Sequence, residues 1–309
     1  MNRVIFESVL DGVFVDRIIR DNEFSMPSMH FHPEYEIYYL LDGARYYFIE
    51  NKTYPINKGS LVLVDAMQIH RTSASGKAAH DRFLIELAEE PFSSCLSEFC
   101  GLKPGGFFAE HAGVWTLDAD GQRTVEGLLG AIADECRGQK AYHQNLVMMK
   151  IAELLLFVAR LKAGGRAGPG ASLSRTTKHI QVHGVTEYIS EHYNQSLSLD
   201  EICRRFYVSK SYLCRIFKEV TGFTVYEYIH MRRVKHAQEL LENSDVSVAQ
   251  IAALLGYGTV THFERMFRKY TETTPLKYRK KMRLIRQRAR ERKAEKDLAK
   301  QGIDGAENL

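Results

Sequence analysis

The segment Ser209–Lys218 reads SKSYLCRIFK, and the segment Thr259–Arg268, 50 positions later, reads TVTHFERMFR. Upstream, Ile202 aligns with Ile251 at an offset of 49, so one residue is inserted at the turn of the second copy. The copies share apolar, arginine, aromatic and basic positions, namely Leu213, Arg215, Phe217 and Lys218 in the first and Phe263, Arg265, Phe267 and Arg268 in the second. Each copy predicts a short helix, a tight turn and a second amphipathic helix.

The second helix of each copy has a polar outer face. Apolar residues at spacings of three and four face the core. The outer face then holds Ser211, Cys214, Arg215 and Lys218 in the first copy, and Val260, Thr261, Glu264, Arg265 and Arg268 in the second. A helix-turn-helix unit places the start of its second helix in the major groove of DNA. We therefore predict guanine pairing by Arg215 and Arg265, and phosphate contacts by Lys210, Lys218, Arg268 and Lys269.

Composition supports a soluble protein with one basic half. The chain of 309 residues is long enough for two domains. Residues 1–174 carry a net charge of −5 and residues 175–309 a net charge of +9, so a polyanion would meet the second half. The five cysteines are scattered without a C-x-x-C pair, which favours reduced thiols. No apolar run approaches the ~18 residues of a membrane span, so we expect a cytoplasmic protein with no membrane partner.

The first half changes its hydrophobic pattern at about residue 120. Before it, short runs of β-branched and aromatic residues alternate with turn signals such as Asp42-Gly43, which predicts a barrel or sandwich. After it, helices are expected at about 122–138 and 143–162, followed by a glycine-rich linker. The expected division is 1–115 for a ligand-sensing barrel, 116–162 for a helical dimerisation segment, 163–176 for the linker, 177–282 for the DNA-binding domain and 283–309 for a charged tail.

The stretch from Leu199 to Lys280 closely resembles the AraC/XylS family of bacterial transcription regulators. Val225 and Glu272 depart from the family pattern, which often has proline and glycine there. The family positions present are Ser209, Leu213, Arg215, Phe217, Lys218 and Gly222 in the first unit, and Gly256, Tyr257, Phe263, Arg265, Phe267, Arg268, Thr274, Pro275, Tyr278 and Arg279 in the second.

The resemblance to this family implies double-stranded DNA as a partner. It also implies a homodimer formed by the helices at 122–138 and 143–162, RNA polymerase as a further candidate partner, and activation rather than repression. The base-reading positions that it implies are Ser211, Cys214 and Arg215 in the first unit, and Val260, Thr261, Glu264 and Arg265 in the second. We expect the first unit to contribute more of the polar base contacts.

The segment from His30 to Glu36, followed by Gly43, resembles the first cupin motif. The implied fold class is α+β, with an N-terminal cupin-like β-barrel followed by helices and an all-α C-terminal domain with two helix-turn-helix units. In sensor barrels of this kind the resemblance implies a small-molecule pocket, commonly for a sugar. The candidate ligand-binding residues are His30, His32, Glu36, Tyr38, Tyr47 and His70, with Tyr46 as a further stacking residue.

The leading interpretation is a ligand-responsive, sequence-specific DNA-binding regulator that senses a small molecule such as a carbohydrate. No catalytic residue, resident metal or cofactor is assigned, and no enzymatic activity is expected. Two alternatives stay open. In the first, a metal on His30, His32, Glu36 and His70 makes the barrel an enzyme fused to a DNA-binding module. The second is a constitutive DNA-binding protein that takes no effector.

Overall fold

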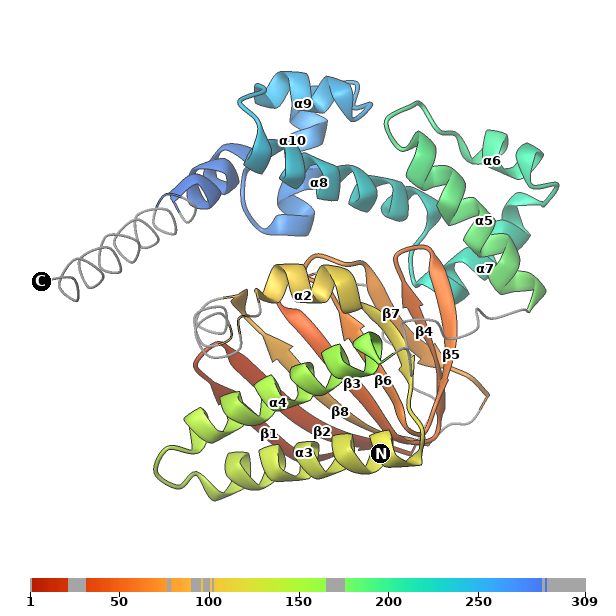
Figure 1. Ribbon diagram of the computed structural model, residues 1–309. Coiled ribbons are helices and arrows are strands. Elements are labelled where there is room, and N and C mark those ends of the chain that lie inside the picture. The colour runs from red at the N-terminus through yellow and green to blue at the C-terminus, as the bar shows by residue number, and fades with distance from the viewer. Residues whose placement is uncertain are drawn as a thin grey trace, which may run out of the picture. The chain divides into compact units, whose positions relative to one another are not determined.

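The computed structural model describes residues 2–21, 32–76, 79–89, 96, 101, 103–164, 176–284 and 287 (Figure 1). The chain forms two compact units. The first comprises Met1–Thr186 and Ser211–Phe223, and the second comprises Glu187–Lys210 and Thr224–Leu309. His30, most of the glycine-rich linker and most of the charged tail lie outside the described residues. The five-part domain division expected from the sequence stays a prediction.

The first unit is built on two antiparallel sheets, as the spacing of its turn signals predicts (Figure 1). One sheet has six strands in the order β1 (Asn2–Leu10), β2 (Val13–Arg20), β8 (His80–Leu87), β3 (Tyr35–Asp42), β6 (Ser60–Val64) and β9 (Gly113–Thr116). The other has three strands in the order β5 (Lys52–Asn57), β4 (Ala44–Ile49) and β7 (His70–Ala74).

Both faces of β3, inside the six-stranded sheet, are buried, and they face different surroundings. On β3, Ile37 and Tyr39 join a core that includes residues of α3 and α4. The alternate residues Tyr38 and Leu40 join a second core, which also holds Tyr47 of the three-stranded sheet. Because successive side chains of a strand point to opposite faces, the even-numbered residues of β3 line the space between the two sheets. The candidate residues Glu36 and Tyr38 therefore lie in that interior.

The helices α2 (Pro104–His111), α3 (Ala119–Gly138) and α4 (His143–Ala163) accompany the sheets. The last two confirm the helices expected at 122–138 and 143–162, and they lie along one face of the six-stranded sheet (Figure 1). Asp118 caps α3 by accepting a hydrogen bond from the Gly121 amide. On α4, Met149 and Leu146 remain 64% and 40% exposed in the single chain. Their role in dimerisation stays a prediction.

The described residues from 177 to 284 are mainly helical, which confirms the fold class expected from the sequence. The helices are α5 (Thr177–His192), α6 (Leu199–Arg205), α7 (Lys210–Thr221), α8 (Val225–Asn243), α9 (Val248–Leu254) and α10 (Val260–Thr271), and a further helix covers residues 275–284. Ser198, Ser247 and Thr259 cap α6, α9 and α10 with their side-chain oxygens. The predicted short helix, turn and second helix are thus present in both copies.

Two departures from the family pattern are accommodated without loss of an element. Val225 is the first residue of α8, whose cap is a complete capping box made by Thr224 and Glu227. Glu272 ends α10 in the left-handed conformation, with φ of 57°, where glycine is the residue with least strain. The family's preference for glycine at this position thus has a conformational reason, and Glu272 adopts the same conformation at a steric cost.

Candidate functional site

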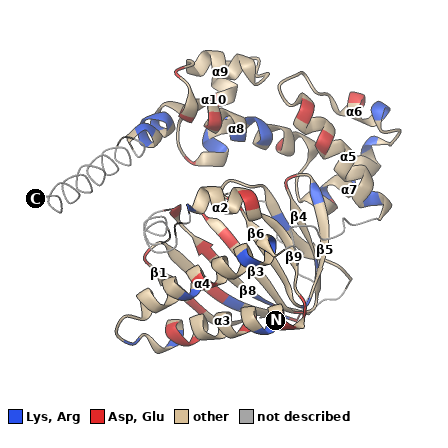
Figure 2. Ribbon diagram, in the orientation of Figure 1, with Lys and Arg blue, Asp and Glu red and all other residues tan. Residues whose placement is uncertain are grey.

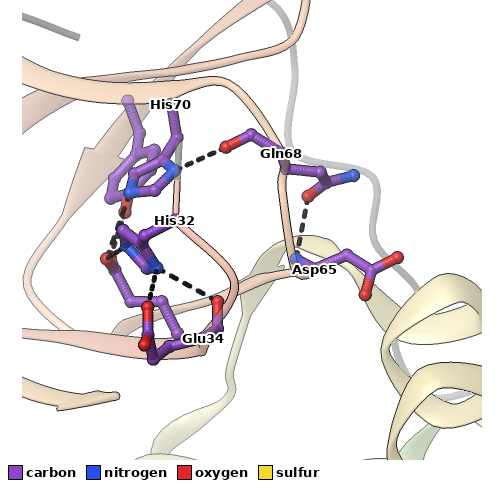
Figure 3. Close-up of polar contacts among 7 residues, drawn as sticks. His32, Glu34, Asp65, Gln68 and His70 are labelled. Carbon is purple, nitrogen blue, oxygen red and sulfur yellow. Dashed lines mark hydrogen bonds and ion pairs between the residues drawn. The ribbon is translucent and has the colours of Figure 1, made fainter. Parts of the chain in front are cut away.

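A buried polar cluster lies between the two sheets of the first unit (Figure 3). Glu36 of β3, only 4% exposed, is its centre. The Tyr47 hydroxyl donates a hydrogen bond of 2.5 Å to Glu36 Oε1, and His70 Nε2 lies 3.1 Å from Glu36 Oε2. His32 Nε2 lies 3.7 Å from the same oxygen. Four of the residues predicted to bind a ligand are therefore brought together from three strands and one loop.

Backbone carbonyl groups fix the orientation of both imidazole rings (Figure 3). His70 Nδ1 lies 2.8 Å from the Gln68 carbonyl oxygen, and His32 Nδ1 lies 3.1 Å from that of Glu34. A carbonyl oxygen can only accept, so each Nδ1 carries a proton and donates it. Both Nε2 atoms then face the Glu36 carboxylate, which makes this end of the interior a set of convergent hydrogen-bonding groups.

The charge of Glu36 is maintained despite its burial. Burial alone would raise its pKa, but the charge of His70, the nearby His32 imidazole and hydrogen bonds from His70 and Tyr47 hold that pKa well below its usual range. Burial lowers the pKa of His32, yet its interaction with the negatively charged Glu36, 3.7 Å away, produces a net rise. Burial and Glu36 raise the pKa of Tyr47 well above its usual value, so its hydroxyl stays protonated and donates.

His32, Glu36 and His70 are also the residues that could hold a metal ion. Among the described residues they form a group whose candidate ligand atoms all lie within 4.8 Å of one another. Two imidazoles and a carboxylate, with each Nδ1 bonded to a carbonyl oxygen, suit a transition metal and its outer shell. His30, the fourth residue of that alternative, lies outside the described residues.

The aromatic residues of the prediction divide between two faces. The Tyr38 ring meets the Tyr47 ring edge-on at 5.2 Å between centroids, inside the space between the sheets. Tyr46 occupies the other face of β4, where its ring lies 4.5 Å from that of His179. The expectation that Tyr46 joins Tyr38 and Tyr47 as a stacking residue is wrong, because adjacent residues of a strand point in opposite directions.

The same interior holds an arginine cluster that the sequence reasoning missed. Arg45 lies two residues before Tyr47 on β4 and is fully buried. Arg82 of β8 makes two buried hydrogen bonds to the Asp16 carboxylate, and Arg20 of β2 lies close enough to feel the charges of Arg82 and Arg45. Acidic and basic residues accordingly appear within the strands of the six-stranded sheet (Figure 2).

The predicted DNA-contacting residues of the first copy lie on the outer side of their helix. Buried residues of α7 include Leu213 and Phe217. Lys210, Ser211, Cys214, Arg215 and Lys218 are all exposed. The Arg215 guanidinium lies 5.4 Å from the centre of the Tyr212 ring, which supports its side chain by a cation–π contact. Lys210 forms an ion pair of 2.6 Å with Asp200, so it must exchange that partner to contact a phosphate.

The second copy has the same division of faces. Phe263 and Phe267 are the buried residues of α10. Val260, Thr261, Glu264, Arg265 and Arg268 are all exposed. Basic residues also occur on α6, α7 and α8 (Figure 2). The outer faces of α7 and α10 therefore have the composition that contact with DNA requires.

Arg233 is a supporting residue of the second copy that the repeat did not reveal. Its guanidinium donates to the carbonyl oxygens of Tyr193, Gly256 and Gln195 at 2.6, 3.0 and 2.8 Å. It also lies 5.1 Å from the centre of the Tyr257 ring. These contacts hold the turn before α10, and they satisfy a buried charge with several acceptors.

A unit of two antiparallel sheets followed by two helix-turn-helix units defines a DNA-binding transcription regulator, and comparison with known proteins agrees. The family described as "AraC-like ligand binding domain" matches residues 15–154, and that described as "Helix-turn-helix domain" matches residues 202–281. The probable transcription factor PqrA of Proteus vulgaris is 37% identical over 86 residues, which are 28% of this chain and 70% of that protein. The chain belongs to the AraC family of transcription regulators, which bind DNA and small-molecule effectors.

Two further relatives differ in how much of each chain is matched. The melibiose operon regulatory protein of Escherichia coli K12 is 24% identical over 275 residues, covering 82% of this chain and 84% of that protein. The Msm operon regulatory protein of Streptococcus mutans is 33% identical over 109 residues, covering 35% of this chain but only 39% of its own length. None of the described helices is long and apolar enough to cross a membrane.

Proposed function

We propose that this regulator senses a carbohydrate or carbohydrate derivative bound between its two sheets. The observation that carries the proposal is the buried cluster of His32, Glu36, Tyr47 and His70, whose donors and acceptors converge in the interior between the sheets. A carboxylate and oriented imidazoles suit the hydroxyl groups of a sugar, and the Tyr38 ring offers it an apolar face. The relative named for the melibiose operon supports the same class of effector.

DNA recognition is assigned to the exposed faces of α7 and α10. Arg215 and Arg265 contact base edges, and Lys210, Lys218 and Arg268 contact phosphates. The other residues on these faces, Ser211, Cys214, Val260, Thr261 and Glu264, set the preference for flanking bases. The protein acts as a homodimer through α3 and α4, and as an activator. Neither metal nor catalysis is needed for this function.

The effector and DNA are linked thermodynamically. A ligand that binds one conformation of the first unit more tightly changes the affinity for DNA, and DNA changes the affinity for the ligand by the same factor. This reciprocity gives the decisive experiment. A thermal-shift screen of sugars and organic acids identifies ligands of the purified protein, and each hit is retested for its effect on binding to a selected DNA site by fluorescence anisotropy.

Two matched variants separate the sites. Glu36→Gln should abolish the thermal shift and the effector's influence on DNA binding while leaving effector-free DNA affinity unchanged. Arg265→Ala should weaken DNA binding and leave the thermal shift unchanged. A hit that stabilises the protein without altering its DNA affinity would refute effector-controlled regulation and favour a constitutive DNA-binding protein.

The ligand-atom geometry of His32, Glu36 and His70 favours a second candidate, a metal-dependent barrel enzyme joined to a DNA-binding module. Elemental analysis of the purified protein tests it. About one equivalent of a transition metal that is lost in His70→Ala is expected for that candidate, and metal-free protein that still responds to a sugar would exclude it.

A further inference from the structure

The interior between the sheets contains an arginine, Arg45, for which the described part of the chain provides no hydrogen-bond partner. Arg45 has no exposed surface, and none of its three guanidinium nitrogens has a hydrogen-bond partner among the described residues. Buried arginines almost always have a carboxylate or several carbonyl oxygens around them, because removal of a charge from water is costly. Arg233 of the same chain shows the ordinary arrangement, with three carbonyl acceptors.

The surroundings of Arg45 add positive charge rather than neutralise it. Arg20 and Arg71 both lie close enough to feel the charge of Arg45. The guanidinium of Arg82 is already bound to Asp16 by two hydrogen bonds. Burial, with repulsion from Arg82 and Arg45, lowers the pKa of Arg20 to about 10. Burial also lowers the pKa of Arg45. Arg20, Arg45 and Arg82 all lie within electrostatic reach of Tyr38, and Asp16 pairs with Arg82, so this end of the interior carries an excess of positive charge.

Tyr38 supplies a second, independent observation. Its hydroxyl is buried and has no hydrogen-bond partner among the described residues. The phenol lies within electrostatic reach of Arg45, Arg82 and Arg20 on one side and of Glu36 on the other. Its ring meets Tyr47 at 5.2 Å, so Tyr38 stands between the arginine cluster and the Glu36 cluster. The Tyr38 hydroxyl and the Arg45 guanidinium are thus two buried donors that could bind the same acceptor group of a ligand.

The alternation of side chains along the strands places the Arg45 guanidinium and the Tyr38 hydroxyl in the same interior between the two sheets. Arg45 and Tyr47 lie two residues apart on β4 and therefore share a face. Tyr47 belongs to the core between the sheets and bonds Glu36 of the opposite sheet. The guanidinium of Arg45 consequently occupies the same interior as the cluster assigned to sugar hydroxyls.

We propose that the effector carries an oxyanion, a carboxylate or a phosphate, which accepts hydrogen bonds from Arg45 and Tyr38 while its hydroxyl groups meet Glu36, Tyr47 and His70. This inference rests on the proposed function and narrows it from carbohydrates to sugar acids and sugar phosphates. A planar guanidinium matches the two oxygens of a carboxylate or phosphate in a bidentate pair. The positive charge of Arg20 also attracts the anionic effector over a longer distance.

The test compares matched panels of hexoses, their uronates and their 6-phosphates on the full-length protein, by thermal shift and by isothermal titration calorimetry. At least one uronate or sugar phosphate should bind while its neutral parent hexose does not. The class with the higher affinity, uronates or phosphates, identifies the anionic group of the effector. Arg45→Met should weaken that binding about 10- to 100-fold, the usual effect of losing a charged hydrogen-bonded pair. Arg17→Met is the control, since Arg17 lies on the other face of β2 and pairs with Asp81 at 2.7 Å.

A stability measurement distinguishes a ligand-binding arginine from a structural one. Without sugar, Arg45→Met should unfold at a higher temperature than the parent, because a buried unpaired charge is replaced by an apolar chain of similar length. A lower unfolding temperature with unchanged anion affinity would overturn the role of Arg45. A neutral hexose that changes both the stability and the DNA affinity of the protein, with no uronate or phosphate doing so, would refute the anionic effector. The proposed sugar-sensing function would then still hold. If no sugar, uronate or sugar phosphate binds, both the anionic effector and the proposed carbohydrate-sensing function are refuted.

Discussion

The Tyr47 hydroxyl on β4 donates a 2.5 Å hydrogen bond to Glu36 Oε1 on β3, so one contact joins the two sheets at the centre of the proposed effector site. Tyr47→Phe removes this donor and leaves a buried carboxylate oxygen with one partner fewer. The loss should cost about 1–3 kcal/mol of unfolding free energy and weaken effector binding. Urea denaturation and calorimetry measure the two effects.

Tyr46→Phe provides the control for that change, because the Tyr46 ring lies on the other face of β4 against His179. It should leave effector affinity unaltered. Equal losses of affinity in the two variants would remove Tyr47 from the site.

Arg215 and Arg265 should each contribute to specific DNA binding. Arg215→Ala and Arg265→Ala are expected to cost about 1–3 kcal/mol at a selected site and less on random DNA, because a bidentate contact to guanine is lost. Arg268→Ala should weaken binding to all sequences and reduce the salt dependence by about one phosphate contact. Fluorescence anisotropy at several salt concentrations measures both.

The first copy should matter more for sequence choice than the second. Arg215→Ala is expected to relax base preference more than Arg265→Ala does, because Val260 and Glu264 offer fewer polar base contacts than Ser211 and Cys214. Arg123→Ala, on α3 and 73% exposed in its side chain, is a control that should change neither. The assignment of the reading helices is wrong if both arginine variants bind specific and random DNA as the parent does.

Gly256 should be essential for the turn before α10. Its φ of +73° is unfavourable for other residues, and an added Cβ would lie 2.4 Å from the Asn194 carbonyl oxygen. Gly256→Ala is therefore expected to destabilise the protein by at least about 1–3 kcal/mol and to lower DNA affinity. Gly258→Ala, two residues later, meets nothing within 4 Å and should be close to neutral. Comparable thermal shifts in both variants would contradict this account.

Local patterns made the DNA-binding half predictable. An amphipathic helix shows its period within a dozen residues, so the buried and exposed sides of α7 and α10 follow from the spacing of residues such as Leu213 and Phe263. The supporting role of Arg233 was not predicted because its three carbonyl acceptors lie 23 to 40 positions away in the sequence. No local pattern carries that information.

The sheet half was predictable only in part. The cupin-like motif placed His32 and Glu36 together, and His70 joined them as predicted. Arg45 was missed because a charged residue next to Tyr46 in a strand is ordinarily assigned to the solvent side. Which face of β4 is buried depends on its pairing with β5 and β7 and on the opposite sheet, which are long-range properties.

The exposed apolar residues of α4 should form the dimer contact. Met149 is 64% exposed in the single chain, and a glutamate there would place a charge in the interface. Met149→Glu is expected to convert a dimer to a monomer in sedimentation velocity experiments and to reduce binding to paired DNA sites. Arg160→Ala on the same helix changes an exposed polar residue and should leave the dimer intact. A parent protein that sediments as a monomer at every concentration would refute the interface.

Acid should destabilise the second unit through His230. Burial, together with the charges of Arg233, His262, Lys269 and Arg265, lowers the pKa of His230 from its ordinary value of 6.5 to about 4. The folded protein therefore binds this proton less readily than the unfolded chain does. The contribution of His230 to stability is complete above about pH 6.5 and declines as the pH falls toward 4.

The measurement is the difference in unfolding free energy between the parent and His230→Gln across that range, which cancels the other titrating groups. Glutamine keeps a hydrogen-bonding group near the Tyr257 hydroxyl, which lies 3.4 Å from His230 Nδ1. The parent should lose stability relative to the variant between pH 6.5 and 4, and the difference should be constant above pH 7. Because the other charges around His230 persist in the variant, a difference that does not change with pH would show that the folded state accepts the proton as readily as the unfolded chain.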